Sequence, residues 1–258
     1  MATVAQAREE IRAGALRKLV LARAVDLLTD VDLDVGAVLR RLRAVYPTCL
    51  RFAVDGLVGA SPELLVARRG DVVAAQPMAG TTARLGDPAV DAQLAAQLLA
   101  SGKDRAEHQV TIERVEEALL PFCSYLDAQA DPQVVAVANV QHLATRVEGR
   151  LSHPRTPVLD LVAALHPTPA VGGDPPAAAL AAIARLEPRG RGRYAGPVGW
   201  CDGSGDGEFA VGIRSAEIRG SRARLYAGVG VVADSEPEAE LAESQAKFQA
   251  MLSALIRP

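Results

Sequence analysis

The sequence predicts an α+β fold, a single domain of large, mostly antiparallel sheets with helices packed around them. Short apolar runs broken by Gly and Pro turns alternate with long stretches of helical periodicity. Near the C-terminus, "DGSGDG" and "IRGSRA" separate apolar runs as hairpin turns do. No repeat or long linker divides the 258 residues, so one domain spanning residues 1–258 is expected.

The first half of the chain alternates helix and strand signals. A helix is expected over residues 2–17, which are rich in Ala, Arg and Glu, and a strand follows in "KLVLARAVDL". The apolar residues of "VDLDVGAVLRRLRAV" recur at helical spacing, whereas residues 49–84 predict short strands. Residues 87–126 predict two helices with a break at Ser101-Gly102.

The second half predicts a strand pair, two helices, three strands and a last helix. The strand pair lies in "VVAVANVQHLATRVEGRL", and the helices lie in "TPVLDLVAALHP" and "DPPAAALAAIARLEP". Three strands are expected between Tyr194 and Ser235. The final amphipathic segment predicts a helix whose start is capped by Asp234 or Ser235.

Composition excludes several classes of partner. A net charge of -3 gives no basic surface for nucleic acid or an anionic membrane. The three cysteines, Cys49, Cys123 and Cys201, are far apart and odd in number, as in a reducing compartment. The N-terminus lacks the apolar core of a signal peptide, and no run has the length of a membrane span. A cytoplasmic protein is therefore expected.

Two pairs of acidic residues raise the question of a metal site. Glu240 and Glu243 share one face of the last helix, and Asp104 and Glu107 repeat the spacing in "KDRAEH". If the pairs face one another across a cleft, their oxygens suit a hard cation such as Mg²⁺. The alternative is a solvated helix face, since such spacing is common on surface helices. The residues alone leave both interpretations open.

The C-terminal third resembles the signature of the chorismate-utilising enzymes. It reads "RGRYAGPVGWCDGSGDGEFAVGIRSAEIRG" followed by "LYAGVGVVADSEPEAELAESQAK". The family includes isochorismate synthases, salicylate synthases, and the synthase subunits for anthranilate and aminodeoxychorismate. Six further blocks match in order, from about residue 12 onward: "KLVLAR", "ASPELL", "MAGTTAR", "SGKDRAEH", "VQHLATRVEG" and "LHPTPAVGG". The resemblance implies the chorismate-binding fold and chorismate as the small-molecule substrate.

The resemblance assigns roles to the acidic residues and to the glycines beside them. It implies that Glu107, Glu240 and Glu243, supported by Asp104, surround a Mg²⁺ that also binds the ring carboxylate of the substrate. Gly228 would bring its backbone close to a substrate carboxylate. The neighbouring glycine, Gly230, fits either such an approach or close packing within a strand.

Further matched residues would bind the two carboxylates of chorismate. Arg214 would grip the side-chain carboxylate bidentately, and Tyr194 would donate to the same group. Lys247 would contact substrate or pair with Glu243 four residues earlier. The remaining positions implied at the pocket are His142 near the ring carboxylate, Gly80 and Thr81 in the pocket wall, and Ala170.

Two residues carry the implied chemistry. Lys18 in "KLVLAR" matches the general base of the water-using members, and Glu63 in "SPELL" matches the general acid. Water would attack ring carbon 2 while hydroxyl leaves carbon 4, with base and acid on opposite sides of the ring. This role requires an uncharged lysine, which burial or a nearby arginine favours and nearby carboxylates oppose.

Ala170 bears on the product, because lyase-competent relatives tend to carry threonine at this position. A small apolar residue offers no hydroxyl for pyruvate elimination, so release of isochorismate is expected rather than salicylate. A salicylate synthase, an amine-forming synthase that uses ammonia or a glutaminase, and an inactive chorismate-binding homologue are the alternatives.

The start of the chain departs from the family pattern. Members usually carry a long segment before the lysine motif, whereas Lys18 stands near the beginning here. We therefore expect a short form without the usual N-terminal extension. Lost strands would expose sheet edges, which proteins normally cover. A monomer, a homodimer or a complex with a partner chain all follow from this expectation.

Overall fold

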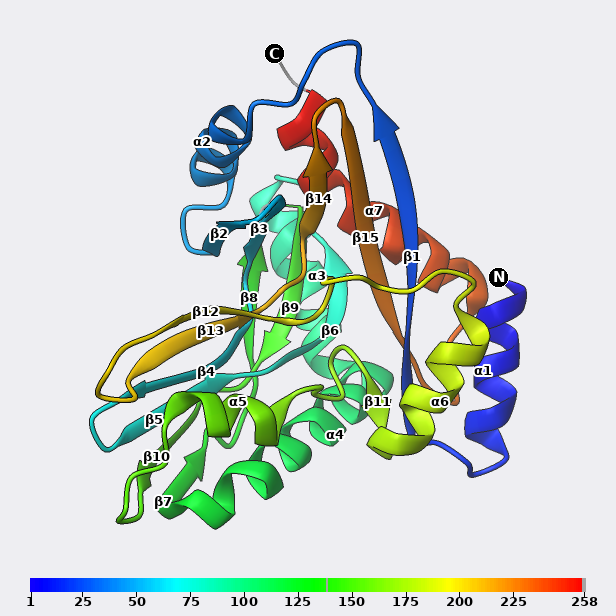
Figure 1. Ribbon diagram of the computed structural model, residues 1–258. Coiled ribbons are helices and arrows are strands. Elements are labelled where there is room, and N and C mark those ends of the chain that lie inside the picture. The colour runs from blue at the N-terminus through cyan, green and yellow to red at the C-terminus, as the bar shows by residue number, and fades with distance from the viewer. Residues whose placement is uncertain (138, 257–258) are drawn as a thin grey trace.

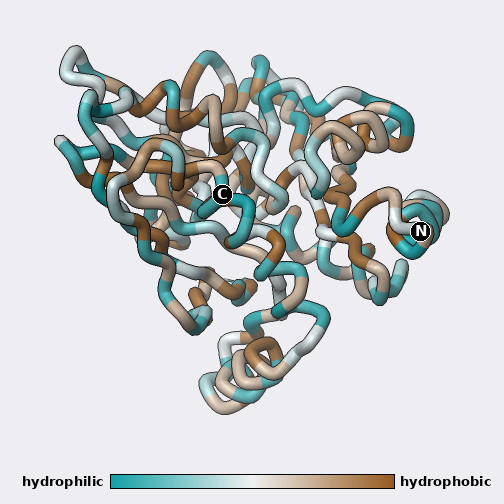
Figure 2. The backbone as a smooth tube through the Cα atoms, turned by 90° about the horizontal axis from the view of Figure 1, so that it is seen from below, coloured by the Kyte–Doolittle hydropathy of each residue, from teal (hydrophilic) through white to brown (hydrophobic). Residues whose placement is uncertain are grey.

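Three sheets organise residues 1–137 and 139–256, the part of the chain described by this computed structural model (Figure 1). Their strands pair antiparallel, as the sequence predicts. Helices lie against them, which confirms the predicted α+β class. The most hydrophobic stretches gather toward the middle of the molecule in Figure 2.

The first sheet has six strands and is backed by the C-terminal helix. In spatial order its strands are β11 (Gly173–Asp174), β1 (Lys18–Leu28), β15 (Arg222–Val231), β14 (Ser215–Arg219), β3 (Leu57–Ser61) and β2 (Leu50–Val54). Helices α7 (Pro237–Ile256) and α2 (Val35–Val45) close a core over one face. Helices α1 (Ala2–Arg12) and α6 (Pro176–Leu186) form a smaller core beside β1.

The second sheet also has six strands. They are, in spatial order, β12 (Pro197–Cys201), β13 (Gly207–Val211), β4 (Leu64–Arg69), β5 (Val72–Gln76), β10 (Val147–Leu151) and β7 (Cys123–Ala128). Helices α4 (Gly102–Leu119) and α5 (Val158–Leu165) contribute the other half of its core. The burial of apolar area between these layers is the main stabilising contribution of this part of the fold.

The third sheet is smaller than the other two, and two of its strands contribute residues to the cavity of the candidate site. It consists of β6 (Met78–Ala83), β9 (Val140–Ala144) and β8 (Gln133–Val137), with β9 in the centre. Helices α3 (Pro88–Ala100) and α4 contact β6. Ser101 caps the second of these helices, since its side chain accepts a hydrogen bond from the backbone of Asp104.

Two strand breaks place polar residues where the first sheet meets the second. Strand β3 passes into β4 through Pro62-Glu63, and β13 passes into β14 through residues 212–214. The breaks lie side by side, because Val211 N donates to Glu63 O at 3.2 Å and Ala60 N donates to Arg214 O at 3.2 Å. Arg214 has a φ of 51°, which is uncommon for a residue with a side chain.

The sequence-based elements need five corrections. The first predicted helix ends at Arg12 instead of 17, and Gly14 follows with a φ of 82°, outside the helical range. The second predicted helix ends at Leu119 instead of 126, because Pro121 cannot continue it, and β7 follows. The expected strand pair at 134–151 is three strands, and the three strands expected between 194 and 235 are four. Ser235 does not cap α7, which begins at Pro237; its hydroxyl accepts from Val232 N at 3.0 Å.

Among the described residues, no helix combines the length and the apolar character that crossing a membrane requires.

Candidate active site

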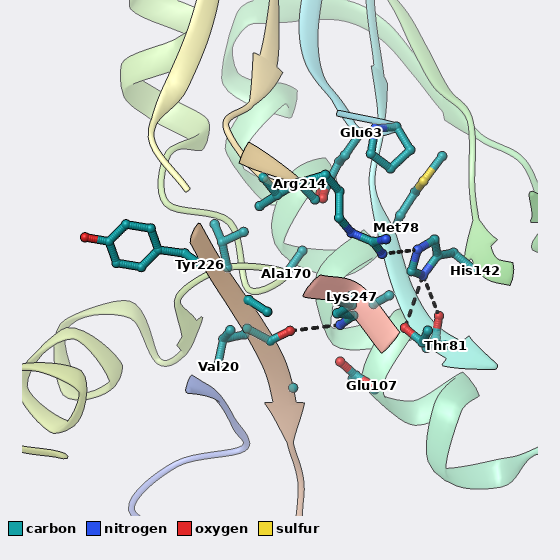
Figure 3. Close-up of a pocket in the computed structure, with 18 of the residues that line it drawn as sticks. Val20, Glu63, Met78, Thr81, Glu107, His142, Ala170, Arg214, Tyr226 and Lys247 are labelled. Atoms are coloured by element: carbon teal, nitrogen blue, oxygen red, sulfur yellow. Dashed lines mark hydrogen bonds between the residues drawn. The ribbon is translucent and has the colours of Figure 1, made fainter. Parts of the chain in front are cut away.

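A cavity lies where the first and third sheets meet the two strand breaks (Figure 3). Residues that the sequence places at the site line it from several separate segments: Glu63, Gly80, Thr81, Glu107, His142, Ala170, Tyr194, Arg214, Gly228 and Lys247.

Arg214 is fixed on one side by a chain of hydrogen bonds. Its Nη2 lies 2.8 Å from His142 Nε2, and His142 Nδ1 lies 3.1 Å from Thr81 Oγ1. A guanidinium only donates, so Nε2 of the histidine must accept and its proton must be on Nδ1. Burial, with the charge of Arg214, holds the pKa of His142 well below its usual range, so the ring is neutral.

The other side of Arg214 has an unused donor. The residue is only 6% exposed, and its buried Nη1 has no hydrogen-bond partner in the described part of the chain. Burial lowers the pKa of Arg214 from its ordinary value, which shows how poorly the charge is solvated. A buried cation with a free donor on a cavity wall is suited to an anionic ligand.

Tyr194 provides a second donor on the same cavity. Burial raises its pKa to about 12, so the phenol keeps its proton at neutral pH. Its ring stacks on Tyr226 with centroids 5.1 Å apart. A Cβ added at Gly228 would lie 3.0 Å from the Tyr194 hydroxyl, so the absence of a side chain on β15 leaves room for this group.

Glu63 is a carboxyl group poised to hold a proton at neutral pH. It lies in the break between β3 and β4 and is only 3% exposed. Burial raises its pKa to about 7, against the opposing effects of the Met78 backbone and nearby Lys18. This is the protonation behaviour that a general acid needs.

Lys18 does not reach the cavity directly. Its side chain is fully buried, with Nζ 3.1 Å from Glu107 Oε1 and 3.3 Å from Thr111 Oγ1. Glu107 lines the cavity, whereas Lys18 is not among the described residues that line it. The lysine is therefore held in an ion pair with a carboxylate of the expected metal site.

Gly230 makes room for this ion pair. A Cβ at Gly230 would lie 1.9 Å from Glu107 Oε1 and 3.2 Å from Lys18 Cε, distances at which Glu107 would have to move. Of the two interpretations that the sequence leaves open for Gly230, close packing is confirmed. The packed neighbour is itself one of the expected site residues.

The acidic residues are near one another but are engaged by lysines. Glu240 Oε1 lies 2.6 Å from Lys103 Nζ, and Glu243 Oε1 lies 2.5 Å from Lys247 Nζ. Asp104 accepts a 2.5 Å hydrogen bond from the Ser101 hydroxyl. It lines a neighbouring pocket together with Glu240 and Glu243.

The described residues contain no group of three or more His, Cys, Asp and Glu side chains already arranged to hold a metal. The donor chemistry nevertheless fits a hard cation. Burial and the charge of Glu243 raise the pKa of Glu240, so the carboxylates repel one another where no cation lies between them. Each of the three expected glutamate ligands is instead held by a lysine.

Lys103 is a site residue that the motif analysis missed. It stands in the first turn of α4 beside Asp104. The charges of Glu240, Glu107 and Glu243 all act to raise the pKa of its ammonium. Its position directly before an expected metal ligand was the available signal. The partner, Glu240, lies 137 residues away, so no local pattern predicts the contact.

The site is thus built for a small anionic molecule. Arg214 and Tyr194 offer donors to the cavity, and Glu63 and Glu107 lie at different ends of it (Figure 3). This arrangement defines an enzyme-like pocket for acid–base chemistry on a carboxylate.

The chain belongs to the family described as chorismate binding enzyme, whose pattern matches residues 1–256. The protein MenF of Mycobacterium tuberculosis is 47% identical over 98% of this chain and 72% of its own length. The isochorismate synthase DhbC of Bacillus subtilis is 44% identical, over 98% of this chain and 66% of its own. The crystal structure of DhbC from Bacillus anthracis matches with a TM-score of 0.94 and 44% identity, over 98% of this chain and 70% of that one. The chain therefore spans about two thirds of the length of the two DhbC proteins.

Proposed function

We propose that this chain is an isochorismate synthase, which binds chorismate and converts it to isochorismate. The observation that carries the proposal is the cavity itself. It joins a carboxyl group with a pKa of about 7, Glu63, to a buried arginine with a free donor, Arg214. Membership of the family supports chorismate as the ligand, and DhbC of Bacillus subtilis supports the reaction.

Substrate binding uses the two donors first. Arg214 Nη1 and the Tyr194 hydroxyl bind the side-chain carboxylate of chorismate, which satisfies the buried cation. Lys247, whose Nζ donates to Gly228 O at 2.9 Å, stands near β15 for the ring carboxylate. Neutral His142 keeps Arg214 in place without adding a competing charge.

The reaction exchanges one hydroxyl for another. Lys18 takes a proton from a water molecule as the oxygen of that water bonds to ring carbon 2. Glu63 gives a proton to the hydroxyl that leaves carbon 4, and the ring double bonds shift between these carbons. Water enters and water leaves, so product and substrate are isomers. Lys18 Nζ lies 3.1 Å from Glu107 Oε1, and a cation that engaged Glu107 would release the amine from this ion pair.

Mg²⁺ is the cofactor we propose, with Glu107, Glu240 and Glu243 as its ligands and Asp104 in support. When bound, it supplies positive charge that neutralises and orients the ring carboxylate. The chain contributes carboxylates from α4 and α7, two helices that meet beside β6.

Ala170 favours isochorismate as the released product. It lies in the cavity wall, and its methyl group offers no hydroxyl to orient the enolpyruvyl group for elimination. A salicylate synthase is the second candidate. An amine-forming synthase is less well supported, because Lys18 is retained beside the cavity.

Incubation with chorismate and Mg²⁺, followed by separation of the products, tests the proposal. Isochorismate is the expected product, with no need for ammonia or a glutaminase. Salicylate and pyruvate, formed without a partner enzyme, would replace the proposal with the second candidate. Unchanged chorismate would indicate a binding protein without turnover.

A further inference from the structure

The basic residues of the chain are distributed unevenly. The sequence holds 28 basic residues, of which three are lysines and the other 25 are arginines. Each lysine pairs with a different glutamate of the acidic group: Lys18 with Glu107, Lys103 with Glu240, and Lys247 with Glu243. Lysine therefore occurs in this chain only where a carboxylate proposed as a metal ligand needs a partner.

Lys103 differs from the other two lysines in its access to solvent. Its side chain is 28% exposed, whereas that of its partner Glu240 is 1% exposed. Lys103 lines the neighbouring pocket with Asp104, Glu240 and Glu243 and is not among the described residues that line the main cavity. Its ammonium is thus the cation in the acidic group with the most direct path to water.

The electrostatics of Lys103 come from the whole acidic group. Burial opposes its charged form, but the hydrogen bond that Lys103 donates to Glu240 and the charges of Glu240, Glu107 and Glu243 outweigh burial and raise the pKa of Lys103. The three glutamates and three lysines sum to zero charge. A divalent cation that enters this group therefore meets three ion pairs that are neutral together, with the carboxylate of Asp104 beside them.

We propose that Lys103 is a resident counter-ion, which stays paired with Glu240 until a divalent cation displaces it. The inference rests on the proposed metal site and adds a residue that weakens metal binding. Without Lys103 the group would carry one net negative charge and attract the metal more strongly. With it, buried Glu240 is never left without a positive partner.

The identity of the residue suits this exchange. A lysine ammonium is a compact, strongly hydrated charge on a flexible stem, so it can release one carboxylate oxygen and turn toward water. An arginine would hold Glu240 through two parallel hydrogen bonds in a planar fork. Arginine stands at 25 of the 28 basic positions, so lysine at position 103 departs from the usual basic residue of this chain.

Direct metal binding tests the inference. Mn²⁺ serves as the probe, and free Mn²⁺ is measured by electron paramagnetic resonance in the absence of chorismate. Lys103→Met removes the charge but keeps a stem of similar length. We expect its Kd for Mn²⁺ to fall about tenfold, the effect of removing one charge near a half-exposed cation site.

Arg105→Met is the matched control, since Arg105 is exposed on the same helix and its loss changes net charge equally. Its Kd should stay within about twofold of wild type.

Thermal unfolding provides the second readout. Lys103→Met should melt at a lower temperature than wild type without metal, because Glu240 is left buried and unpaired, and saturating Mn²⁺ should remove the difference. Lys103→Arg keeps the charge if the first variant fails to fold, and it should bind Mn²⁺ no more tightly than wild type. Tighter binding by Lys103→Arg would contradict the inference.

The outcomes separate this inference from the proposed activity. An unchanged or weaker Mn²⁺ affinity in folded Lys103→Met overturns the counter-ion role even if isochorismate is formed. No Mn²⁺ binding by either protein overturns the role together with the metal site. Tighter binding in an inactive chain would support the counter-ion and remove only the proposed reaction.

Discussion

Glu63 shows how a single side chain acquires its chemistry from its position in the fold. The break between β3 and β4 directs it into the cavity, and burial raises its pKa to about 7. The motif "SPELL" predicts a carboxyl group at this place but says nothing of its protonation. That property comes from burial, which outweighs the lowering effects of the Met78 backbone and of Lys18, Lys247 and Arg214, groups that the fold brings together from other segments.

The raised pKa of Glu63 makes stability depend on pH. The folded protein holds this proton to about pH 7, whereas the unfolded chain loses it near 4.5, so the folded state is progressively destabilised as pH rises between the two values. Glu63→Gln stays neutral, so its free energy of unfolding should exceed that of wild type by about 3 kcal/mol at pH 8 and by less than about 1 kcal/mol at pH 5.

Urea unfolding at the two pH values measures this difference. The exposed residue Glu117 supplies the control, because Glu117→Gln should give no comparable pH-dependent gain. Equal stability of Glu63→Gln and wild type at pH 8 would mean that the folded protein ionises Glu63 at no cost in stability. Glu63 would then not hold the proton that a general acid needs.

Arg214 is the residue on which substrate affinity depends most directly. Lysine at this position would keep a charge but lose the planar fork that reaches both His142 and a carboxylate. Arg214→Lys should raise the KM for chorismate by at least about tenfold, with a smaller effect on kcat, because a charged hydrogen bond contributes about 1.5–3 kcal/mol. Steady-state kinetics provide the measurement, and an unchanged KM would remove Arg214 from the binding site.

At the scale of single elements, the strand and helix patterns were largely predictable, and their ends were less so. The apolar run of β1 and the helical spacing of α2 were enough to identify both. The start of strand β7 was missed because residues 123–126, which follow Pro121, were assigned to the preceding helix. The pairing of Lys18 with Glu107 could not be predicted, since it depends on how β1 packs against α4.

Strand β15 carries a sharp test of that packing. Alanine at Gly230 would place a methyl group 1.9 Å from Glu107 Oε1, so the Lys18–Glu107 pair must move. We expect Gly230→Ala to destabilise the protein by about 2 kcal/mol or more and to abolish turnover. Gly190→Ala is the control, because a Cβ there meets no atom within 4 Å. Wild-type stability of Gly230→Ala in a urea titration would show that this part of the site is looser than described.

At the scale of the whole molecule, the three sheets convert scattered motifs into one cavity. The seven motif blocks predicted which residues belong together, and ten of the expected site residues line the same space. The pair of Lys247 with Glu243, one of the two interpretations that the sequence offers for Lys247, is confirmed. The sequence could not reveal that Lys18 stands behind Glu107, or that Lys103 engages Glu240. The contact of Lys103 with Glu240 arises from the approach of α4 and α7, whose residues are far apart in the chain.

Turnover of chorismate in H₂¹⁸O with Mg²⁺ tests the central claim most directly, because only addition of solvent water puts a labelled oxygen on ring carbon 2. Isochorismate that carries one ¹⁸O is the expected product, and Glu63→Gln should form it far more slowly. Unlabelled isochorismate, or salicylate and pyruvate in its place, would contradict the reaction proposed for this cavity.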